Sequence, residues 1–278
     1  MPELPEVETI ARTLAPHVRG RRVTGHCLLN PGTLQGDVPL SILTGGTFAA
    51  PGRRGKLLLL PLHVADADDG PDAVIGVGIH LKMSGRLFVY PAGTEPGPHT
   101  RLIFDLDDGS RLFFDDARKF GYARVLTPAV LAAWPFWTRL GPEPLEIDAA
   151  AFAARFAARA AAIKALLLDQ TVLAGCGNIY ADESLFRAGI RPETRASTLS
   201  PERLHGLHAA LQEVLRESIA ACGSSIRDYR TARGDAGAFQ NSFRVYGRSG
   251  ERCLACGAKL RACKVAGRAT VYCPRCQK

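Results

Sequence analysis

Two Cys-x-x-Cys pairs near the end of the chain place the strongest constraint on how it can fold. Cys253 and Cys256 form the first pair and Cys273 and Cys276 the second, with sixteen residues between the pairs. Each such turn presents two thiolates to one side of a tetrahedron, so two turns complete a four-sulfur zinc shell. The sequence therefore predicts a β-hairpin built around one structural Zn²⁺, because a four-cysteine site leaves no open position for catalysis.

A pair of disulfides is the alternative interpretation of these cysteines. The first residues, Met-Pro-Glu-Leu-Pro-Glu-Val-Glu, are acidic and rich in proline, whereas a signal peptide is basic and then apolar. The longest apolar runs, 57–60 and 160–168, are too short or too interrupted to cross a bilayer. We therefore expect a cytoplasmic protein without a membrane partner, in which a reducing environment favours zinc over disulfides. The remaining cysteines are interpreted as buried or incidental thiols: Cys27, Cys176, Cys222 and Cys263.

Basic residues are concentrated in the last fifth of the chain. The whole chain has 35 Lys and Arg against 27 Asp and Glu, a net charge of +8. Residues 223–278 hold 12 of the basic residues and three of the acidic ones, whereas the first 222 residues are nearly balanced. This distribution favours a polyanionic partner, with nucleic acid first and an anionic membrane surface second. The basic segment between the cysteine pairs could bind phosphates or simply be solvated.

Hydrophobic periodicity divides the chain into a strand-rich first part and a helical second part. Residues 5–18 have apolar side chains at helical spacing. Asp108-Gly109 separates two alternating segments, 101–107 and 110–116, and this dipeptide favours a hairpin turn. Further strands are expected at 56–62, 74–83 and 85–90, and further helices at 149–162, 163–168, 179–188 and 201–222. The pattern predicts an α+β fold with a boundary near 136–148.

Four sequence motifs are spread along the whole chain. They are Met1-Pro-Glu-Leu-Pro-Glu-Val-Glu-Thr9, Asp169-Gln170 followed by Gly177-Asn178-Ile-Tyr-Ala-Asp-Glu-Ser184, Val245-Tyr246-Gly247-Arg248 and the terminal Cys-Pro-Arg-Cys-Gln-Lys. These motifs, in this order, resemble those of the formamidopyrimidine-DNA glycosylases, bacterial enzymes that excise oxidised purines from DNA.

The resemblance implies an N-terminal antiparallel β-sandwich with flanking helices, a helix-two-turn-helix domain and a C-terminal zinc β-ribbon, with DNA bound between the halves. We expect the parts as follows: 1–135 a catalytic β-sandwich domain, 136–148 a linker, 149–222 the helix-two-turn-helix DNA-binding domain, 223–243 a lesion-recognition loop and 244–278 the zinc hairpin.

The resemblance also implies catalytic residues. In the family, Met1 is removed and the amine of Pro2 attacks C1′ of the damaged nucleotide. An α-amino group has a pKa of about 8, against roughly 10.4 for lysine, so more of it is nucleophilic at neutral pH. Glu3 matches the general acid and base, and Glu6 a second acidic position, although both would also favour a helix N-terminus. Lys56 matches the lysine assigned to β-elimination, and Arg268 the arginine assigned to δ-elimination.

Other family positions contact DNA. A base in a duplex must be flipped out before it can react, and Met83, Arg118 and Phe120 match the residues that fill the resulting hole. Core packing is the alternative for Met83 and Phe120. The positions that match phosphate or other DNA contacts are His99, Lys164, Asn178 and Tyr246, and Arg159 could replace a missing basic residue before Lys164.

Three residues depart from the family pattern around the hole-filling residues. Lys82 replaces the glycine usual in His-Leu-x-Met-Ser-Gly, and Ala117 and Lys119 replace Pro and Arg in Asp-Pro-Arg-Arg-Phe-Gly. Lys119 keeps the charge of arginine but loses its bidentate geometry.

We therefore expect a monomeric, bifunctional DNA glycosylase and abasic-site lyase acting on 8-oxoguanine and formamidopyrimidines in double-stranded DNA, within the cytoplasm at the nucleoid. An endonuclease VIII-type enzyme for oxidised pyrimidines is the nearest alternative, although Leu4 and the long loop after Cys222 argue against it. A non-catalytic zinc protein that binds damaged DNA is the alternative from another class, and it would need neither Pro2 nor Glu3.

Overall fold

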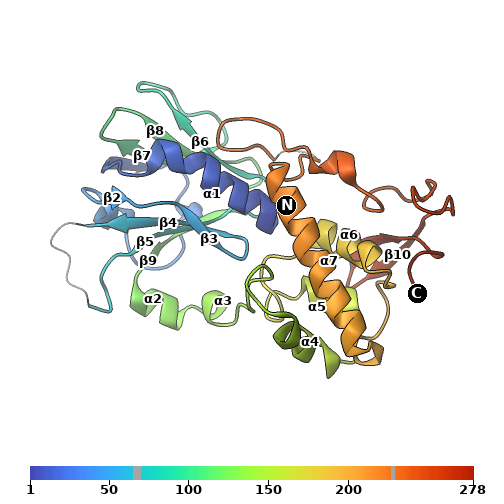
Figure 1. Ribbon diagram of the computed structural model, residues 1–278. Coiled ribbons are helices and arrows are strands. Elements are labelled where there is room, and N and C mark those ends of the chain that lie inside the picture. The colour runs from blue at the N-terminus through green and yellow to red at the C-terminus, as the bar shows by residue number, and fades with distance from the viewer. Residues whose placement is uncertain (65–69, 227–228) are drawn as a thin grey trace. The chain divides into compact units, whose positions relative to one another are not determined.

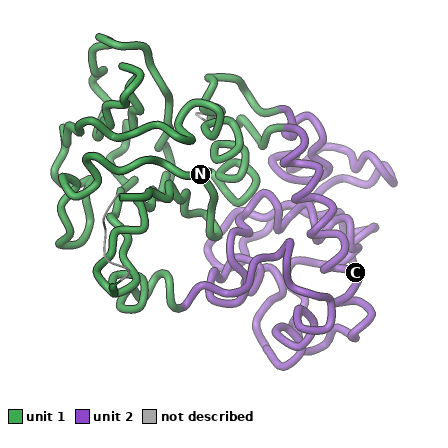
Figure 2. Tube along the Cα trace, turned by 60° about the vertical axis from the view of Figure 1, so that its left-hand side comes forward, with its two compact units in different colours: residues 1–138, 222–237 green, residues 139–221, 238–278 purple. Residues whose placement is uncertain are grey.

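The computed structural model describes residues 1–64, 70–226 and 229–278. They form two compact units, residues 1–138 with 222–237 and residues 139–221 with 238–278 (Figure 2). The segment expected to be a lesion-recognition loop, 223–243, contributes to both units, and its residues 227–228 lie outside the described part of the chain.

Unit 1 contains two antiparallel sheets and helix α1 (Figure 1). The first sheet has the order β1-β7-β8-β6, and the second has the order β2-β4-β5-β9 with β3 paired to β4. The elements are α1 (Leu4–Val18), β1 (Val23–Leu28), β2 (Thr47–Phe48), β3 (Gly52–Arg54), β4 (Leu57–His63), β5 (Gly76–His80), β6 (Gly85–Tyr90), β7 (Thr100–Leu106), β8 (Arg111–Asp116), β9 (Tyr122–Leu126), α2 (Pro128–Ala133) and α3 (Pro135–Thr138). Short 3-10 turns occur at Pro31–Thr33 and Leu40–Leu43. This arrangement confirms the antiparallel α+β architecture.

The apolar face of α1 joins the two sheets in one hydrophobic core. Val7, Ile10 and Leu14 are at most 1% exposed and pack in the same cluster as Phe48 of β2 and Phe104 of β7. The helical spacing of these side chains explains why the first helix was predictable. Burying each such side chain contributes about 1.5 to 3 kcal/mol to folding, so the core fixes the start of the chain.

The turn between β5 and β6 differs from the sequence expectation. A strand was expected over 74–83, but β5 ends at His80 because Lys82 has a φ of +50°. A left-handed residue cannot continue a strand. The next strand begins after a tight turn in which the Gly85 N–H donates to the Leu81 carbonyl at 2.9 Å. The predicted hairpin around Asp108-Gly109 is confirmed, with Asp105 opposite Arg111 and Gly109 at a φ of +83°.

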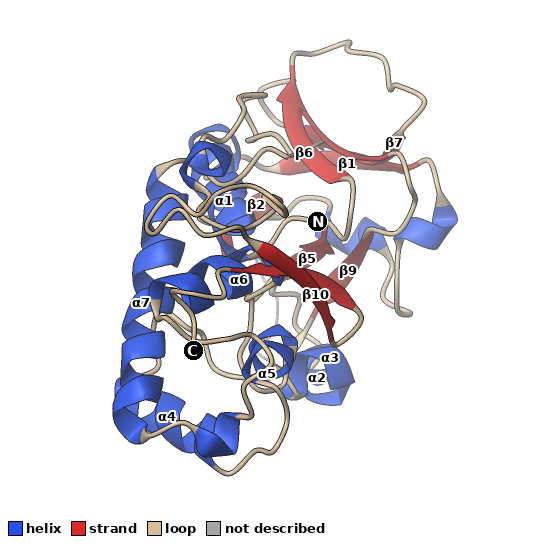
Figure 3. Ribbon diagram, turned by 90° about the vertical axis from the view of Figure 1, so that its right-hand side faces the viewer, coloured by secondary structure: helices blue, strands red, loops and turns tan. Residues whose placement is uncertain are grey.

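Unit 2 combines helices with a two-stranded hairpin, drawn in blue and red in Figure 3. The elements are α4 (Ala149–Ala157), α5 (Ile163–Leu168), α6 (Asn178–Arg187), α7 (Pro201–Ala220), β10 (Arg261–Val265) and β11 (Arg268–Tyr272), with 3-10 turns at Ala196–Thr198 and Phe239–Ser242. The hairpin turns at Ala266 and Gly267, which both have a positive φ as a two-residue turn requires. None of the described helices is long and apolar enough to cross a membrane.

Helix α4 is shorter than its composition suggested. The Ala-rich segment favours helix to residue 162, but α4 ends at Ala157. The following backbone pairs with residues 194–197 instead: the Ala196 N–H donates to Ala161 O at 3.0 Å, and the Ser197 N–H to Arg159 O at 2.9 Å. Tertiary backbone hydrogen bonds therefore override the local helix propensity.

Candidate active site and metal centre

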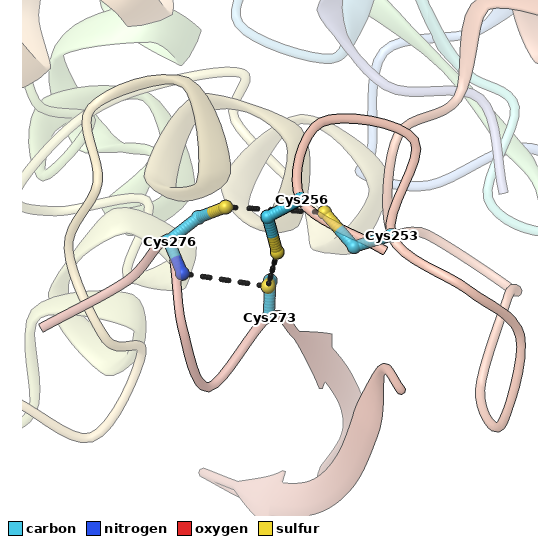
Figure 4. A group of neighbouring side chains, drawn as sticks. All are labelled: Cys253, Cys256, Cys273 and Cys276. Atoms are coloured by element: carbon cyan, nitrogen blue, oxygen red, sulfur yellow. Dashed lines mark hydrogen bonds between the residues drawn. The ribbon is translucent and has the colours of Figure 1, made fainter. Parts of the chain in front are cut away.

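The four paired cysteines converge at the base of the β10–β11 hairpin (Figure 4). The Sγ atoms of Cys253 and Cys276 lie 3.9 Å apart, those of Cys256 and Cys273 lie 3.5 Å apart, and all four sulfurs lie within 4.8 Å of one another. A zinc ion with Zn–S distances of about 2.3 Å would give sulfur separations of roughly 3.8 Å. A disulfide needs sulfurs about 2.05 Å apart, and these cysteines are free thiols. The geometry therefore fits a tetrahedral zinc centre.

The first residues of the chain are held against the start of α1. Pro2 is buried, and Glu3 and Glu6 are 3% and 1% exposed. The Glu3 N–H donates to Glu6 Oε2 at 2.8 Å, so the carboxylate of Glu6 closes the first helical turn. This places a buried carboxylate directly after Pro2 in a backbone segment of fixed conformation.

Glu6 also holds the segment 222–237, which belongs to the same unit. Its Oε1 accepts a hydrogen bond from the Ser224 N–H at 2.8 Å, and its carbonyl accepts one from the Tyr229 hydroxyl at 3.4 Å. Farther along α1, the Thr13 hydroxyl accepts the Ala232 N–H at 3.1 Å. Burial and the charge of Glu6 raise the pKa of Tyr229, so its hydroxyl stays a donor at neutral pH. Glu6 thus connects the N-terminal segment with the loop.

Lys56 lies at the turn into β4, beside a buried histidine. Lys56 is 7% exposed, His80 is 6% exposed, and Leu57 is opposite His80 in the sheet. Burial, and then the charges of Lys82 and Lys56, lower the pKa of His80 to about 3, so the imidazole is neutral at physiological pH. Its Nδ1 accepts the Lys82 N–H at 3.1 Å, which leaves the proton on Nε2.

A buried carboxylate organises the three residues expected to fill the hole in DNA. Asp116 is 1% exposed, and its Oδ1 accepts the Ser84 hydroxyl at 2.5 Å and the Arg118 N–H at 3.2 Å. Its Oδ2 accepts the Gly121 N–H at 2.7 Å. These bonds fix the turn that carries Met83 to the loop that carries Arg118 and Phe120.

The side chains on this scaffold are exposed. Met83 is 38% exposed and Phe120 is 55% exposed, so core packing does not explain either residue. The guanidinium carbon of Arg118 lies 4.9 Å from the centre of the Phe120 ring, a cation–π contact. His99 is also exposed, and its carbonyl accepts the Asp116 N–H at 2.8 Å. Hydrogen bonds of one buried aspartate therefore position the segments that carry Met83, His99, Arg118 and Phe120.

Lys164 is buried, so it does not match the phosphate contact that the family resemblance implies. Its side chain is 0% exposed and forms an ion pair of 2.6 Å with Asp182, whose side chain is 1% exposed. Its Nζ also donates to the Thr270 hydroxyl at 2.7 Å and to the Ala269 carbonyl at 3.3 Å. The Lys164 ammonium therefore binds groups inside unit 2 and connects β11 with α5 and α6. Its side chain is not accessible at the surface, where a phosphate could bind.

The other expected DNA contacts of unit 2 lie at or near its surface. Arg159 is exposed, with its Nε donating to the Arg155 carbonyl, and Arg268 is exposed at the start of β11. Asn178 is half-buried and donates to Ala269 O at 2.9 Å. Tyr246 is also half-buried, and its N–H donates to Glu183 Oε1 at 2.8 Å.

Three buried acidic residues that support these positions were not identified from the sequence. Asp116 orders the exposed loop of unit 1, and Asp182 pairs with Lys164. Glu183 accepts the backbone N–H groups of residues 244, 245 and 246, which fixes the segment that carries Tyr246. The signal for Asp182 and Glu183 was their position on the buried face of a helix, where a charged residue needs a partner.

Three sequence profiles match consecutive parts of the chain. The formamidopyrimidine-DNA glycosylase N-terminal domain matches residues 1–123, the formamidopyrimidine-DNA glycosylase H2TH domain matches residues 140–230, and the zinc finger found in FPG and IleRS matches residues 250–278. The last match, together with the sulfur geometry, confirms the predicted structural zinc centre, with one ion bound by the four cysteines.

Relatives and solved structures agree over the full length of the chain. A formamidopyrimidine-DNA glycosylase of Nitratidesulfovibrio vulgaris strain Hildenborough is 50% identical, with all of both chains covered. A crystal structure of a Lactococcus lactis FPG variant bound to DNA containing Fapy-dG has a TM-score of 0.88 at 33% identity, again with full coverage of both chains. A structure of MutM with DNA containing carbocyclic 8-oxo-G has a TM-score of 0.86 at 34% identity and full coverage.

Proposed function

The chain belongs to the formamidopyrimidine-DNA glycosylase family, and on this basis we propose that it removes oxidised purines from duplex DNA in base-excision repair and then cleaves the strand. Its substrates would be 8-oxoguanine and formamidopyrimidines in double-stranded DNA. It would act as a monomer. The four zinc-binding thiolates require a reducing compartment, which supports action in the cytoplasm.

Pro2 would be the nucleophile once Met1 has been removed. Its nitrogen lone pair attacks C1′ of the damaged nucleotide, the bond from C1′ to the base breaks, and the base leaves with the bonding electrons and takes up a proton. Glu3 would protonate the sugar ring oxygen as the ring opens, which leaves an iminium between Pro2 and C1′. The adjacency of Pro2 and a 3% exposed Glu3 supports this assignment, because the backbone fixes the distance between them.

Strand cleavage would follow from the same iminium. The iminium acidifies the C2′ protons, so loss of one of them expels the 3′ phosphate, and a second elimination expels the 5′ phosphate. Lys56 is proposed for the first elimination and Arg268 for the second. The exposure of Arg268 on a hairpin stabilised by zinc is consistent with such a role.

Base extrusion would use the exposed loop of unit 1. Flipping a nucleotide costs a few kcal/mol of stacking, which inserted side chains partly restore. Met83 and Phe120 would act as apolar wedges, and Arg118 would hydrogen-bond the cytosine left without a partner. His99, Asn178, Arg159 and Tyr246 are proposed to contact the DNA backbone and set its register. For Lys164, its burial supports a role within the protein in place of a direct phosphate contact.

The observation that carries the proposal is the conformation of the N-terminal segment, where Pro2 and Glu3 precede α1 and the Glu3 N–H is bonded to Glu6. The test compares the wild type with Glu3→Gln on duplexes that carry 8-oxoguanine, an oxidised pyrimidine or a preformed abasic site. We expect the wild type to prefer 8-oxoguanine opposite cytosine, and the variant to lose base release by about 10²-fold or more.

The same experiment separates the alternatives. Preference of the wild type for the oxidised pyrimidine would favour an endonuclease VIII-type specificity. Binding without release of any base would favour a damage-binding protein, and full base release by Glu3→Gln would contradict the proposed proton transfer.

A further inference from the structure

Lys82 occupies a backbone position that suits glycine better than lysine. Its φ is +50°, in the left-handed region that side chains with a Cβ rarely adopt. Two hydrogen bonds fix this turn: the Lys82 N–H donates to His80 Nδ1, and the Gly85 N–H donates to Leu81 O. Because backbone strain of this kind is found mainly at functional sites, it points to a functional role for the Lys82 side chain.

The side chain of Lys82 lies over an aromatic ring next to His80 in the sheet. Its Nζ lies 5.4 Å from the ring centre of Tyr122, and Tyr122 is opposite His80 in the β5–β9 pair. The charges of Lys82 and Lys56 both act on the His80 imidazole. His80 therefore experiences the charges of two lysines, and its own proton is on Nε2.

No carboxylate neutralises this group among the residues that the structure describes. Neither Lys56 nor Lys82 takes part in an ion pair in the described ranges 1–64, 70–226 and 229–278. Partial burial lowers the pKa of Lys82, so its ammonium loses hydration without gaining an ion-pair partner in the described part of the chain. An external anion would relieve this cost.

We propose that Lys82 is a further DNA-binding residue, which completes with Lys56 and His80 a three-donor site for a backbone phosphate of the damaged strand. Its position next to the exposed Met83 would put the added charge beside the wedge, at the place where the backbone is distorted by base flipping. The inference rests on the proposed function, since the anion is a phosphodiester of the DNA that the enzyme binds.

Three substitutions at Lys82 separate charge from backbone strain. Lys82→Gln removes the charge and keeps the strained Cβ, Lys82→Gly removes both, and Lys82→Arg keeps the charge. Arg21→Gln is the matched control, because it makes the same change in net charge at the exposed Arg21–Asp108 pair, near the other end of the β7–β8 hairpin from Asp116.

The measurement is the affinity for a duplex that carries a tetrahydrofuran abasic analogue opposite cytosine, as a function of salt. Each lost phosphate contact makes the slope of log K against log salt shallower by about 0.9. If the variant and the wild type bind equally at about 1 M salt, the variant then binds roughly eightfold more weakly at about 0.1 M salt. We expect this loss in Lys82→Gln and Lys82→Gly, and wild-type slopes in Lys82→Arg and Arg21→Gln. The Tm of Lys82→Gly should be no lower than that of the wild type, because glycine relieves the left-handed strain.

Several results would overturn the inference. If Lys82→Gly and Lys82→Gln keep the wild-type slope while the wild type binds the duplex and excises 8-oxoguanine, Lys82 is not a phosphate contact and the proposed function still stands. If the wild type neither binds nor excises, the proposed function itself fails. If titration with inorganic phosphate alone shows Lys82-dependent binding and the slope for DNA is unchanged, the site takes a free ion in place of the DNA backbone.

Discussion

The buried ion pair between Lys164 and Asp182 gives the most quantitative prediction. The two side chains are 0% and 1% exposed, and the Nζ–Oδ1 distance is 2.6 Å. Burial disfavours both charges: it lowers the pKa of Lys164, and it raises the pKa of Asp182 to about 6. Each charge is therefore kept in the fold mainly by the other charge and by hydrogen bonds to β11.

Removing one partner leaves the other charge buried and unpaired. Asp182→Ala would leave the ammonium with only the Thr270 hydroxyl and the Ala269 carbonyl, and would remove the acceptor of the Val271 N–H. Lys164→Met would leave the carboxylate without its counter-charge. We expect each single substitution to lower the free energy of unfolding by about 3 to 5 kcal/mol. The double substitution should cost clearly less than the sum, because it leaves no unpaired charge.

The assay is urea unfolding of the zinc-loaded protein for the wild type, both single variants and the double variant. Hydrogen exchange at the Val271 amide reports whether β11 detaches from the helices. Single losses below about 1 kcal/mol, or losses that simply add in the double variant, would refute the argument that the pair is a buried, mutually dependent unit.

Three further predictions concern other parts of the molecule. Removing zinc with a chelator, or changing Cys256→Ser, should unfold the hairpin. Thiol titration should find four more reactive thiols after chelation than before it, and an unchanged number of reactive thiols would contradict the zinc centre. Because His80 has a pKa of about 3 in the fold and 6.5 as its ordinary value, the unfolded state takes up a proton first as the pH falls below about 6.5. The contribution of His80 to the free energy of unfolding should therefore decrease by about 1.4 kcal/mol per pH unit toward pH 5. Urea unfolding at a fixed zinc concentration should show this pH dependence in the wild type and lack it in His80→Gln. Asp116→Asn should cost about 1 to 3 kcal/mol in the same assay, since one amide oxygen cannot replace both carboxylate oxygens as acceptors for Ser84, Arg118 and Gly121.

Local patterns explain which parts of the fold could be predicted. The helix near the N-terminus and the Asp108-Gly109 hairpin are specified by periodicity and by turn chemistry within a few residues. The zinc centre is specified by spacing, because each Cys-x-x-Cys turn sets its own geometry. The early end of α4 depends on backbone pairing with residues 194–197, a tertiary effect that helix propensity does not include.

Burial explains what could not be predicted about the candidate site. Lys164 was expected at a phosphate, but its partner Asp182 lies on a different helix, and no local pattern shows that their side chains meet. Asp116 likewise acts through contacts with Ser84, Arg118 and Gly121, of which Ser84 is far away in sequence. Conversely, the exposure of Met83 and Phe120 gives a physical reason to separate them from the core, which the sequence alone could not provide.

The most direct test of the proposed mechanism is to trap the covalent intermediate. The protein, with removal of Met1 verified by intact mass, is mixed with a duplex that carries 8-oxoguanine opposite cytosine and treated with borohydride, and the adduct is mapped by peptide mass spectrometry. The mechanism predicts a reduced adduct on the N-terminal peptide at Pro2. An adduct on a lysine-containing peptide such as that of Lys56, or excision of 8-oxoguanine with no adduct at all, would contradict Pro2 as the nucleophile.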